Sequence, residues 1–408
     1  MDRDDPIAVA LGAVVQAGEL AGAASLVWRD GKVVQASAVG WRDLEAGAPL
    51  ARDSLFRIAS MTKPVTSVAA MMLLEEGAFA LEDPITRWAP EFSQMRVLRS
   101  PVGPLDETAP ADRAITFDDL LTHRSGLTYG PFHAGPIAAA YKAALGRDLD
   151  SHLSPDAWIA ALAALPLIDQ PGAGFHYGQS SELLGLLIAR MEGAPLGEVL
   201  RRRIFEPLGM KDTGFVVPRE KRDRRAGLYG FDANGRLTAL VTVPGGAALA
   251  ERPDDLEFVS GGAGLWSTLD DYLAFARLFV EGGCSGGVRL LSPETLALMT
   301  ANRLTQTQRL EARMLGMPVF GTGHGFGLGV AVVLDPQTAS SLRGKGGMGT
   351  VGWPGAYGGW WQADPTDGSV MILLQHNMVE LEQIAQGFGL GGYGAIAEFH
   401  ALASTLRS

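Results

Sequence analysis

The chain has 408 residues, of which 47% are hydrophobic and 19% charged, enough for one large globular domain or two smaller ones. A net charge of −11 disfavours nucleic acid and anionic membranes as main partners, and the single cysteine, Cys284, excludes an internal disulfide. The N-terminus starts with acidic residues rather than the basic region of a secretory signal, and no run of 18 apolar residues predicts a membrane span. We therefore expect a cytoplasmic protein.

The first 50 residues predict a helix followed by a hairpin. Residues 5–17 form an apolar pattern that begins at Pro6 and places Ile7, Leu11, Val14 and Val15 on one buried face. Two β-rich runs then flank Asp30-Gly31, a strong signal for a hairpin turn. The next helix, within "RIASMTKPVTSVAAMMLLEEG" at 57–77, has no polar face and therefore belongs in the interior.

Helices with readable starts dominate the middle of the chain. Thr116 and Asp119 form a capping-box pattern, and Ser154 and Ser292 each precede a proline at the first helical position. Helical patterns continue to about residue 210, whereas the glycine-rich residues 217–265 cannot be assigned. β-rich runs return from Phe326, and the last segment predicts a helix.

Strands at both ends with helices between them predict an α/β fold. The simplest arrangement is one antiparallel sheet built from residues 1–90 and 260–408, flanked by the terminal helices, with a mainly helical domain inserted at 91–259.

Ser60 and Lys63 open the apolar helix as an S-x-x-K motif. Residues three apart share a helix face, so the two side chains are neighbours. A serine hydroxyl needs an adjacent base, and a lysine held against a buried helix loses solvation, which favours its neutral form. Ser60 is therefore a candidate nucleophile and Lys63 its base. The alternative is an ordinary helix end with a solvated lysine, because S-x-x-K alone is a weak signal.

The blocks around this motif resemble the serine β-lactamase-related family, which includes class C β-lactamases, penicillin-binding-protein-like peptidases and family VIII carboxylesterases. The resemblance runs in family order over nearly the whole chain, through "FRIASMTK", "LEDPITRWAPEF", "ITFDDLLTHRSGL", "FHYGQSSELLGLLI", "IFEPLGMKDTGF", "GGAGLWSTLDDYLAFARL" and "GWPGAYGGWWQADP". It is closest to the family VIII esterases. It implies a β-lactamase/transpeptidase-like fold and a catalytic Ser60.

The family's second motif, a tyrosine followed by a residue and an asparagine, matches Tyr177-Gly178-Gln179. The resemblance implies that Tyr177 takes a proton and later returns it to the leaving group. Gln179 replaces the usual asparagine in contact with the substrate.

The third motif matches Trp353-Pro354-Gly355, where lactamases carry a lysine, and Trp353 and Gly355 are the substrate-binding candidates. Pro354 fits an edge strand, since it donates no ladder hydrogen bond. The resemblance places the oxyanion hole at the backbone N–H groups of Ser60 and Ala356. The apolar Trp353 favours neutral acyl esters over carboxylate-bearing lactams.

Several other residues compete for functional roles. Lys345-Gly346-Gly347 also reads K-x-G, and Arg343 or Lys345 could supply the missing cation. Ser285 matches G-x-S-x-G, but a helix rather than a strand precedes it. We expect a structural role for His123 and either a packing or a site role for His176. The aromatic residues that could line a pocket are Tyr129, Phe132, Trp360 and Trp361, although each taken singly is expected to be a core or surface packing residue.

These observations predict a serine hydrolase that cleaves carboxylic esters of short to medium acyl chain through Ser60, Lys63 and Tyr177. The histidine spacing implies no metal, and no cofactor is expected. The expected partner is a small-molecule ester, and a homo-oligomer stays open. The alternatives are β-lactamase or D-Ala-D-Ala peptidase-like activity, acyl transfer to an alcohol acceptor, or a catalytically silent binding homologue.

Overall fold

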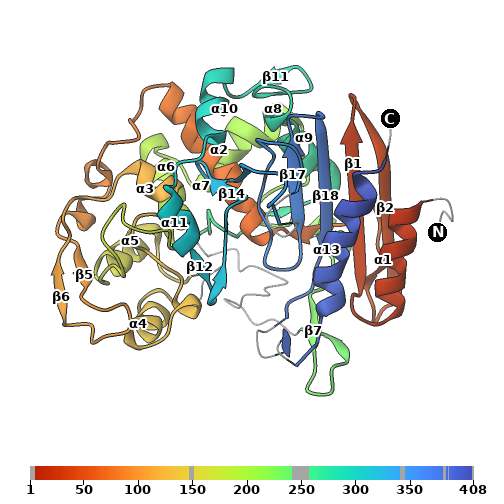
Figure 1. Cartoon of the computed structure of the whole chain (residues 1–408), viewed down its shortest axis with the longest axis horizontal. Coiled ribbons are helices and arrows are strands. Elements are labelled where there is room, and N and C mark those ends of the chain that lie inside the picture. Colours follow the sequence, from red (N-terminus) through yellow and green to blue (C-terminus); the bar gives the residue numbers. More distant parts are fainter. Residues whose placement is uncertain are drawn as a thin grey trace.

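The computed structural model describes residues 5–146, 151–240, 257–340, 345–379, 383–384 and 386–406. Two helices lie along one face of a sheet, and a larger, mainly helical region lies beyond its other face (Figure 1). None of the helices in these ranges combines the length and the apolarity that a bilayer crossing requires.

The main sheet has eight strands in the order β14-β15-β16-β17-β18-β1-β2-β3, and every pairing is antiparallel. In chain order the strands are Gly22–Arg29 (β1), Lys32–Asp43 (β2), Ala48–Pro49 (β3), His324–Phe326 (β14), Ala331–Val333 (β15), Val351–Gly352 (β16), Trp360–Asp364 (β17) and Ser369–Gln375 (β18). β1 pairs with β18, with Leu26 opposite Ile372. The sheet therefore joins the two ends of the chain, and the predicted fold class is confirmed.

The N-terminal elements follow the sequence pattern closely. Helix α1 spans Pro6–Gln16, and the Asp5 side chain caps it by accepting hydrogen bonds from two backbone N–H groups. Asp30 and Gly31 both have positive φ, +50° and +79°, as the type I′ turn of a tight hairpin requires. α1 and helix α13 (Leu390–Ala403) cover one face of the sheet, where Ile7 and Leu11 are buried as predicted.

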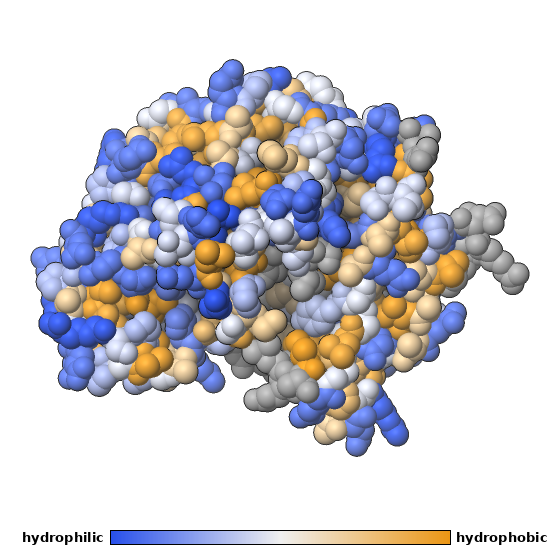
Figure 2. Space-filling model, viewed as in Figure 1, coloured by the Kyte–Doolittle hydropathy of each residue, from blue (hydrophilic) through white to orange (hydrophobic). Residues whose placement is uncertain are grey.

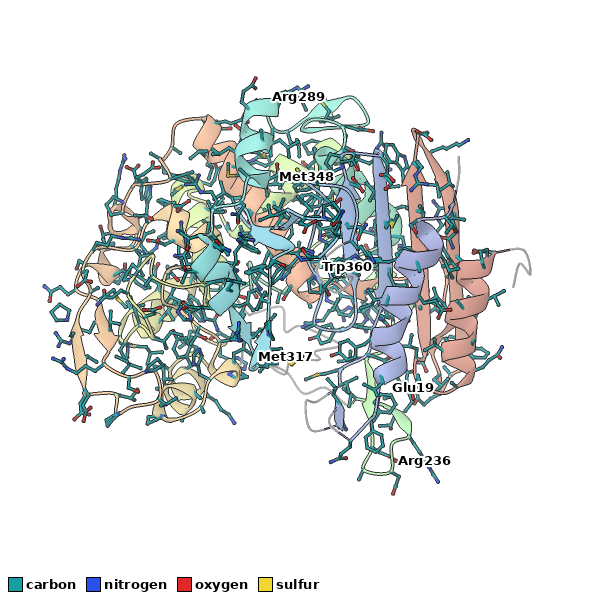
Figure 3. The ribbon with its side chains drawn as sticks, in the orientation of Figure 1. Glu19, Arg236, Arg289, Met317, Met348 and Trp360 are labelled. Atoms are coloured by element: carbon teal, nitrogen blue, oxygen red, sulfur yellow. The ribbon has the colours of Figure 1, made fainter. Side chains whose placement is uncertain are left out.

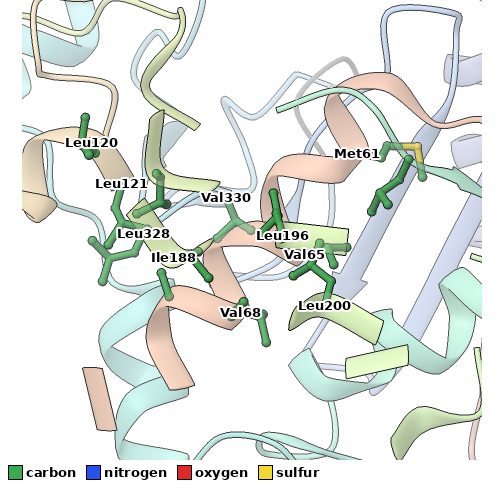
Figure 4. Close-up of a cluster of buried hydrophobic side chains, with 14 of the residues drawn as sticks. Met61, Val65, Val68, Leu120, Leu121, Ile188, Leu196, Leu200, Leu328 and Val330 are labelled. Carbon is green, nitrogen blue, oxygen red and sulfur yellow. The ribbon is translucent and has the colours of Figure 1, made fainter. Parts of the chain in front are cut away.

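The opposite face of the sheet carries the larger core. Helix α9 (Leu269–Ala276) packs directly on β1, β17 and β18. Behind it, α2 (Thr62–Glu75) is surrounded by other helices, and the side chains of Val65 and Val68 lie among those of Ile188, Leu196 and Leu200 (Figure 4). The apolar helix is therefore interior, as its sequence predicts.

The middle of the chain supplies most of the remaining helices. They are Phe117–Leu121 (α3), Pro136–Leu145 (α4), Pro155–Ala163 (α5), Ser180–Glu192 (α6), Leu196–Leu200 (α7), Glu206–Leu208 (α8), Pro293–Thr300 (α10) and Gln306–Glu311 (α11), with a π-helical turn at Arg201–Phe205. The capping box of Thr116 with Asp119 and the N-caps Ser154 and Ser292 are all present. The domain limits at 91–259 stay a prediction.

Short strand pairs connect these helices. They are Phe56–Arg57 (β4) with Trp266–Ser267 (β9), Arg96–Leu98 (β5) with Thr108–Pro110 (β6), Tyr229–Phe231 (β7) with Leu237–Ala239 (β8), Cys284–Ser285 (β10) with Val288–Arg289 (β11), and Arg313–Met314 (β12) with Met317–Pro318 (β13). The exposed Met317 marks the last of these hairpins in Figure 3. On the face shown in Figure 2, hydrophobic residues form small groups among hydrophilic ones.

Candidate active site

A sharp strand-to-helix turn presents Ser60. Directly after β4, Ala59 adopts φ +46°, a left-handed conformation that costs a non-glycine residue on the order of 1 kcal/mol. The chain then forms a 3-10 turn over Ala59–Met61 and continues into α2. A residue of another helix stabilises the turn, because the hydroxyl of the buried Tyr272 on α9 donates to the Met61 carbonyl at 2.9 Å. Ser60 is thereby left half-buried at the N-terminal end of a rigid, interior helix.

Lys63 lies beside Ser60, as the spacing of the motif predicts. Its side chain is only 1% exposed, and its Nζ is 3.4 Å from the Ser60 Oγ. The same nitrogen is 3.1 Å from the Tyr129 hydroxyl oxygen and donates to the Gly262 carbonyl at 2.9 Å. The alternative of a solvated lysine is therefore wrong, and Lys63 is placed to exchange a proton with Ser60.

The buried carboxylate of Glu182 is linked to Lys63 through the Tyr129 hydroxyl. The Tyr129 hydroxyl donates to Glu182 Oε1 at 2.8 Å, and the Ser260 hydroxyl donates to the same oxygen at 2.9 Å. Glu182 on α6 is fully buried. A Cβ at residue 262 would lie 2.2 Å from its Oε1, so the close approach of Gly262 to both Lys63 and Glu182 requires glycine.

Sequence reasoning missed Glu182 and Ser260 and treated Tyr129 only as a pocket-lining aromatic residue. The available signal was the single acidic residue inside the apolar run "SSELLGLLI". A charge on the buried face of a helix is costly unless it is paired, so its presence indicates a polar partner in the core.

Tyr177 lies on the other side of Lys63, among aromatic rings. The Lys63 Nζ is 4.5 Å from the centroid of the Tyr177 ring, a cation–π distance. The Tyr177 hydroxyl accepts a hydrogen bond from the Trp353 Nε1 at 3.1 Å, and Phe132 stacks on its ring. Among the hydrogen bonds of the described residues, none joins Tyr177 to Ser60 or Lys63. The Tyr177 ring therefore lies beside the Lys63 amine, whereas the tyrosine hydroxyl that is hydrogen-bonded to this amine is that of Tyr129.

His123 supports Tyr177 from behind. It is buried, its ring centroid is 4.8 Å from that of Tyr177, and the Gly178 N–H points at its Nδ1 at 3.4 Å. Burial, and then the charge of Lys63, lowers the pKa of His123 well below its usual value. The ring packs in an aromatic cluster with Phe175, Tyr177 and Phe326, and its structural role stays a prediction.

The third motif follows a strand rather than occupying one. β16 ends at Gly352 and pairs with β15 and β17, so the expected edge strand is wrong. Pro354 is tolerated because it lies beyond the ladder, where no N–H is needed. A Cβ on Gly355 would lie 2.6 Å from the Ile58 carbonyl oxygen, so this loop is pressed against the turn that carries Ser60. Ala356 is the next residue of the loop and is exposed.

All three proposed substrate contacts are buried, Gly355 among them. Trp353 is 1% exposed and packs against Phe326 as well as Tyr177, so its indole is part of the wall behind Tyr177 rather than an open surface. Gln179 is 2% exposed, and its Oε1 has no hydrogen-bond partner among the described residues. Their contact with a substrate stays a prediction.

Two predicted pocket-lining aromatic residues are not at the site. Trp360 and Trp361 are consecutive on β17 and therefore face opposite sides of the sheet. Trp360 packs against His400 of α13, and Figure 3 shows it beside that helix, whereas Trp361 packs against Tyr272. Both belong to the core, which is the packing role that we expected for each of them taken singly, and neither lines a pocket at the site.

The competing motifs also lie elsewhere. The Lys345 carbonyl accepts from Gln362, which shares a face of β17 with Trp360, so Lys345 lies on the α13 side of the sheet. Arg343 lies outside the described residues. Ser285 lies in the short strand β10 after a helical segment, so it is not on a nucleophile elbow. His176 pairs with Asp169, at 2.8 Å from Nε2 to Oδ2.

Comparison with known proteins yields one family and several relatives. The family described as Beta-lactamase matches residues 10–386. An uncharacterized protein of Mycobacterium tuberculosis is 48% identical over 364 residues, covering 89% of this chain and 88% of its own. Esterase EstB of Burkholderia gladioli is 33% identical over 371 residues, covering 88% and 87%. The solved structure of EstCE1, titled a hydrolase with promiscuous acyltransferase activity, is 27% identical with a TM-score of 0.76, covering 96% and 97%.

Proposed function

Because the chain belongs to the beta-lactamase family, we propose that it is a serine hydrolase that cleaves carboxylic esters of short to medium acyl chain. The observation that carries this proposal is the 3.4 Å approach of the buried Lys63 Nζ to the Ser60 Oγ. The 33% identity to an esterase over most of both chains supports the choice of ester substrates.

The proposed reaction proceeds through an acyl-enzyme. The Ser60 Oγ attacks the ester carbonyl carbon while Lys63 accepts the hydroxyl proton. The Ser60 and Ala356 backbone N–H groups stabilise the oxyanion. The C–O bond to the alcohol then breaks, and the proton passes to the leaving oxygen through Lys63 and Tyr177. Water attacks the acyl-enzyme with the same groups acting as base, which releases the acid and restores Ser60.

The preference for neutral esters rests on Trp353. Trp353 aligns where lactamases carry a lysine. The Lys345 carbonyl accepts from Gln362, which lies two residues after Trp360 on β17 and therefore on the α13 face of the sheet. A carboxylate-bearing lactam would lose a charge-assisted hydrogen bond worth about 1.5–3 kcal/mol. We therefore expect kcat/KM for short-chain p-nitrophenyl esters to exceed that for nitrocefin by at least ~10²-fold, part of it from the intrinsic reactivity of these esters.

A p-nitrophenyl ester series measured alongside nitrocefin tests this proposal. Equal turnover of nitrocefin and p-nitrophenyl acetate would refute the ester preference. Labelling by a fluorophosphonate probe separates an active serine hydrolase from a silent binding homologue, which would not react.

Acyl transfer to an alcohol is the second candidate. The observation that favours it is the similarity to EstCE1, whose title names promiscuous acyltransferase activity. The two candidates share every step up to the acyl-enzyme and differ in the acceptor. Adding a primary alcohol to the ester assay and measuring the new ester by mass spectrometry distinguishes transfer from hydrolysis.

A further inference from the structure

We propose that Glu182 is a positioning residue, which acts through the Tyr129 hydroxyl to direct the lone pair of Lys63 at Ser60. This inference rests on the proposed function and deepens it. Its basis is the chain of contacts from Glu182 Oε1 through the Tyr129 hydroxyl to the Lys63 Nζ, at 2.8 and 3.1 Å.

The donor and acceptor roles in this chain are determined by chemistry. The Tyr129 hydroxyl donates its single proton to Glu182 Oε1. The Tyr129 oxygen must then accept from Lys63. The Gly262 carbonyl also only accepts, at 2.9 Å from the same nitrogen.

A neutral lysine amine has two N–H groups and one lone pair. The Tyr129 oxygen and the Gly262 carbonyl take both N–H groups. The direction that remains is toward the Ser60 Oγ at 3.4 Å. The lone pair therefore faces the proton that the reaction must remove, and this orientation holds as long as Glu182 keeps the Tyr129 proton.

Glu182 also contributes charge. Glu182 is fully buried, where Coulomb interactions are weakly screened. Among the described residues that contact Lys63 or Tyr129, it is the one with a carboxylate. Two hydrogen bonds separate it from the Lys63 Nζ, through the Tyr129 hydroxyl. Among the described residues, the other titratable groups that face Lys63 are Tyr129, Tyr177 and His123, and burial lowers the pKa of His123 well below its usual value.

A structural role is the competing explanation. Through Ser260, Glu182 also ties α6 to the turn before β9, since the Ser260 hydroxyl donates to the same carboxylate oxygen. Ser260→Ala removes that tie without removing the charge or the link to Tyr129. It is therefore the matched control for Glu182→Gln, which keeps the side-chain shape and removes the charge.

The test follows the titration of Lys63 by NMR in protein labelled with [ε-¹³C]lysine. The chain has six lysines, so the resonances are few, and Lys63→Arg assigns the one that matters. In Glu182→Gln, the NMR titration curve of Lys63 should move to lower pH, because the neighbouring negative charge is removed. In Ser260→Ala the midpoint should stay near that of the unmodified protein. An unchanged midpoint in Glu182→Gln, or an equal fall in both variants, would overturn the inference.

Kinetics give a second readout. The rising limb of the kcat/KM pH profile should move to lower pH in Glu182→Gln by the same amount. If that variant does not fold, Tyr129→Phe replaces it: kcat should fall ~10–10²-fold with KM nearly unchanged, because the amine is free to turn. Full activity of Tyr129→Phe would also overturn the inference. An unmodified protein that does not hydrolyse esters would refute the proposed function alone, since the NMR titration needs no turnover.

Discussion

The two sides of Lys63 are built from different chemistry. On the inner side, Tyr129, Glu182 and the Gly262 carbonyl surround the amine with directional hydrogen bonds. On the outer side, Tyr177 is held by ring contacts with His123, Phe132 and Trp353. In the outer group, the hydrogen bond from the Trp353 indole to the Tyr177 hydroxyl is the polar link.

This difference separates two tasks. Hydrogen bonds between groups of fixed donor and acceptor character determine where a proton is and where a lone pair points. Ring packing determines where a side chain sits but says little about its protons. We therefore expect the inner side to set the basicity and direction of Lys63, and the outer side to set the position of Tyr177.

The largest expected loss of activity concerns Ser60, the proposed nucleophile on which both sides of Lys63 act. Ser60→Ala should lower ester turnover by ~10⁴-fold or more, since members of a catalytic group act as a unit. Ser285→Ala is the control and should stay within a few-fold of the unmodified rate. The measurement is kcat/KM for p-nitrophenyl acetate. Loss of activity in Ser285→Ala instead of Ser60→Ala would place the nucleophile elsewhere.

The next effect tests the inner side. Lys63→Arg should reduce kcat by ~10³-fold although it keeps the positive charge, because arginine does not deprotonate at working pH and its planar fork has another shape. Lys345→Arg, on the α13 side of the sheet, should leave kcat unchanged. Near-normal turnover by Lys63→Arg would exclude proton transfer by Lys63.

A double-mutant cycle tests the outer side. Tyr177→Phe should lower kcat ~10²-fold if its hydroxyl carries a proton, and Trp353→Phe, which removes one donor, only about threefold to tenfold. The two losses should not add, because each variant breaks the same 3.1 Å hydrogen bond. Simple additivity would show that Trp353 acts on the reaction without Tyr177.

The smallest expected effect concerns His123 and tests whether this residue of the outer side contributes to the pH dependence of kcat/KM. His123 has φ +54°, a conformation that asparagine tolerates, so His123→Asn is the suitable substitution. The acidic limb of the kcat/KM profile should not move, because the pKa of His123 in the folded protein already lies well below its usual value. A shift of this limb would assign it to the outer side.

The same histidine contributes to stability in a pH-dependent way. The pKa of an unperturbed histidine is about 6.5, so below this pH the unfolded chain binds a proton that His123 in the folded protein does not bind. The stabilising contribution of His123 is therefore present above pH 6.5 and is lost as the pH falls toward its lowered pKa. The free energy of unfolding should therefore fall less steeply on acidification in His123→Asn, by at most ~1.4 kcal/mol per pH unit. Chemical denaturation between pH 7.5 and 5 measures this slope.

Sequence alone determined the features that depend on neighbours along the chain. Caps at Thr116, Ser154 and Ser292, the Asp30-Gly31 turn and the proximity of Ser60 to Lys63 all arise within four residues, where helix and turn geometry set the distances. Strand patterns at both ends of the chain predicted the α/β class, and the family resemblance implied its β-lactamase-like type.

Tertiary structure alone decided which distant residues complete the site. Tyr129, Glu182 and Gly262 come from three separate segments, and only the packing of α6 and of the 260–264 turn against α2 brings them to Lys63. Strand register likewise decided that Trp360 and Trp361 belong to the core and that Trp353 lies beyond an interior strand. Local patterns carry periodicity and capping, whereas a partner across the core is selected by burial, because a buried charge or hydroxyl must find whichever polar group the fold places beside it.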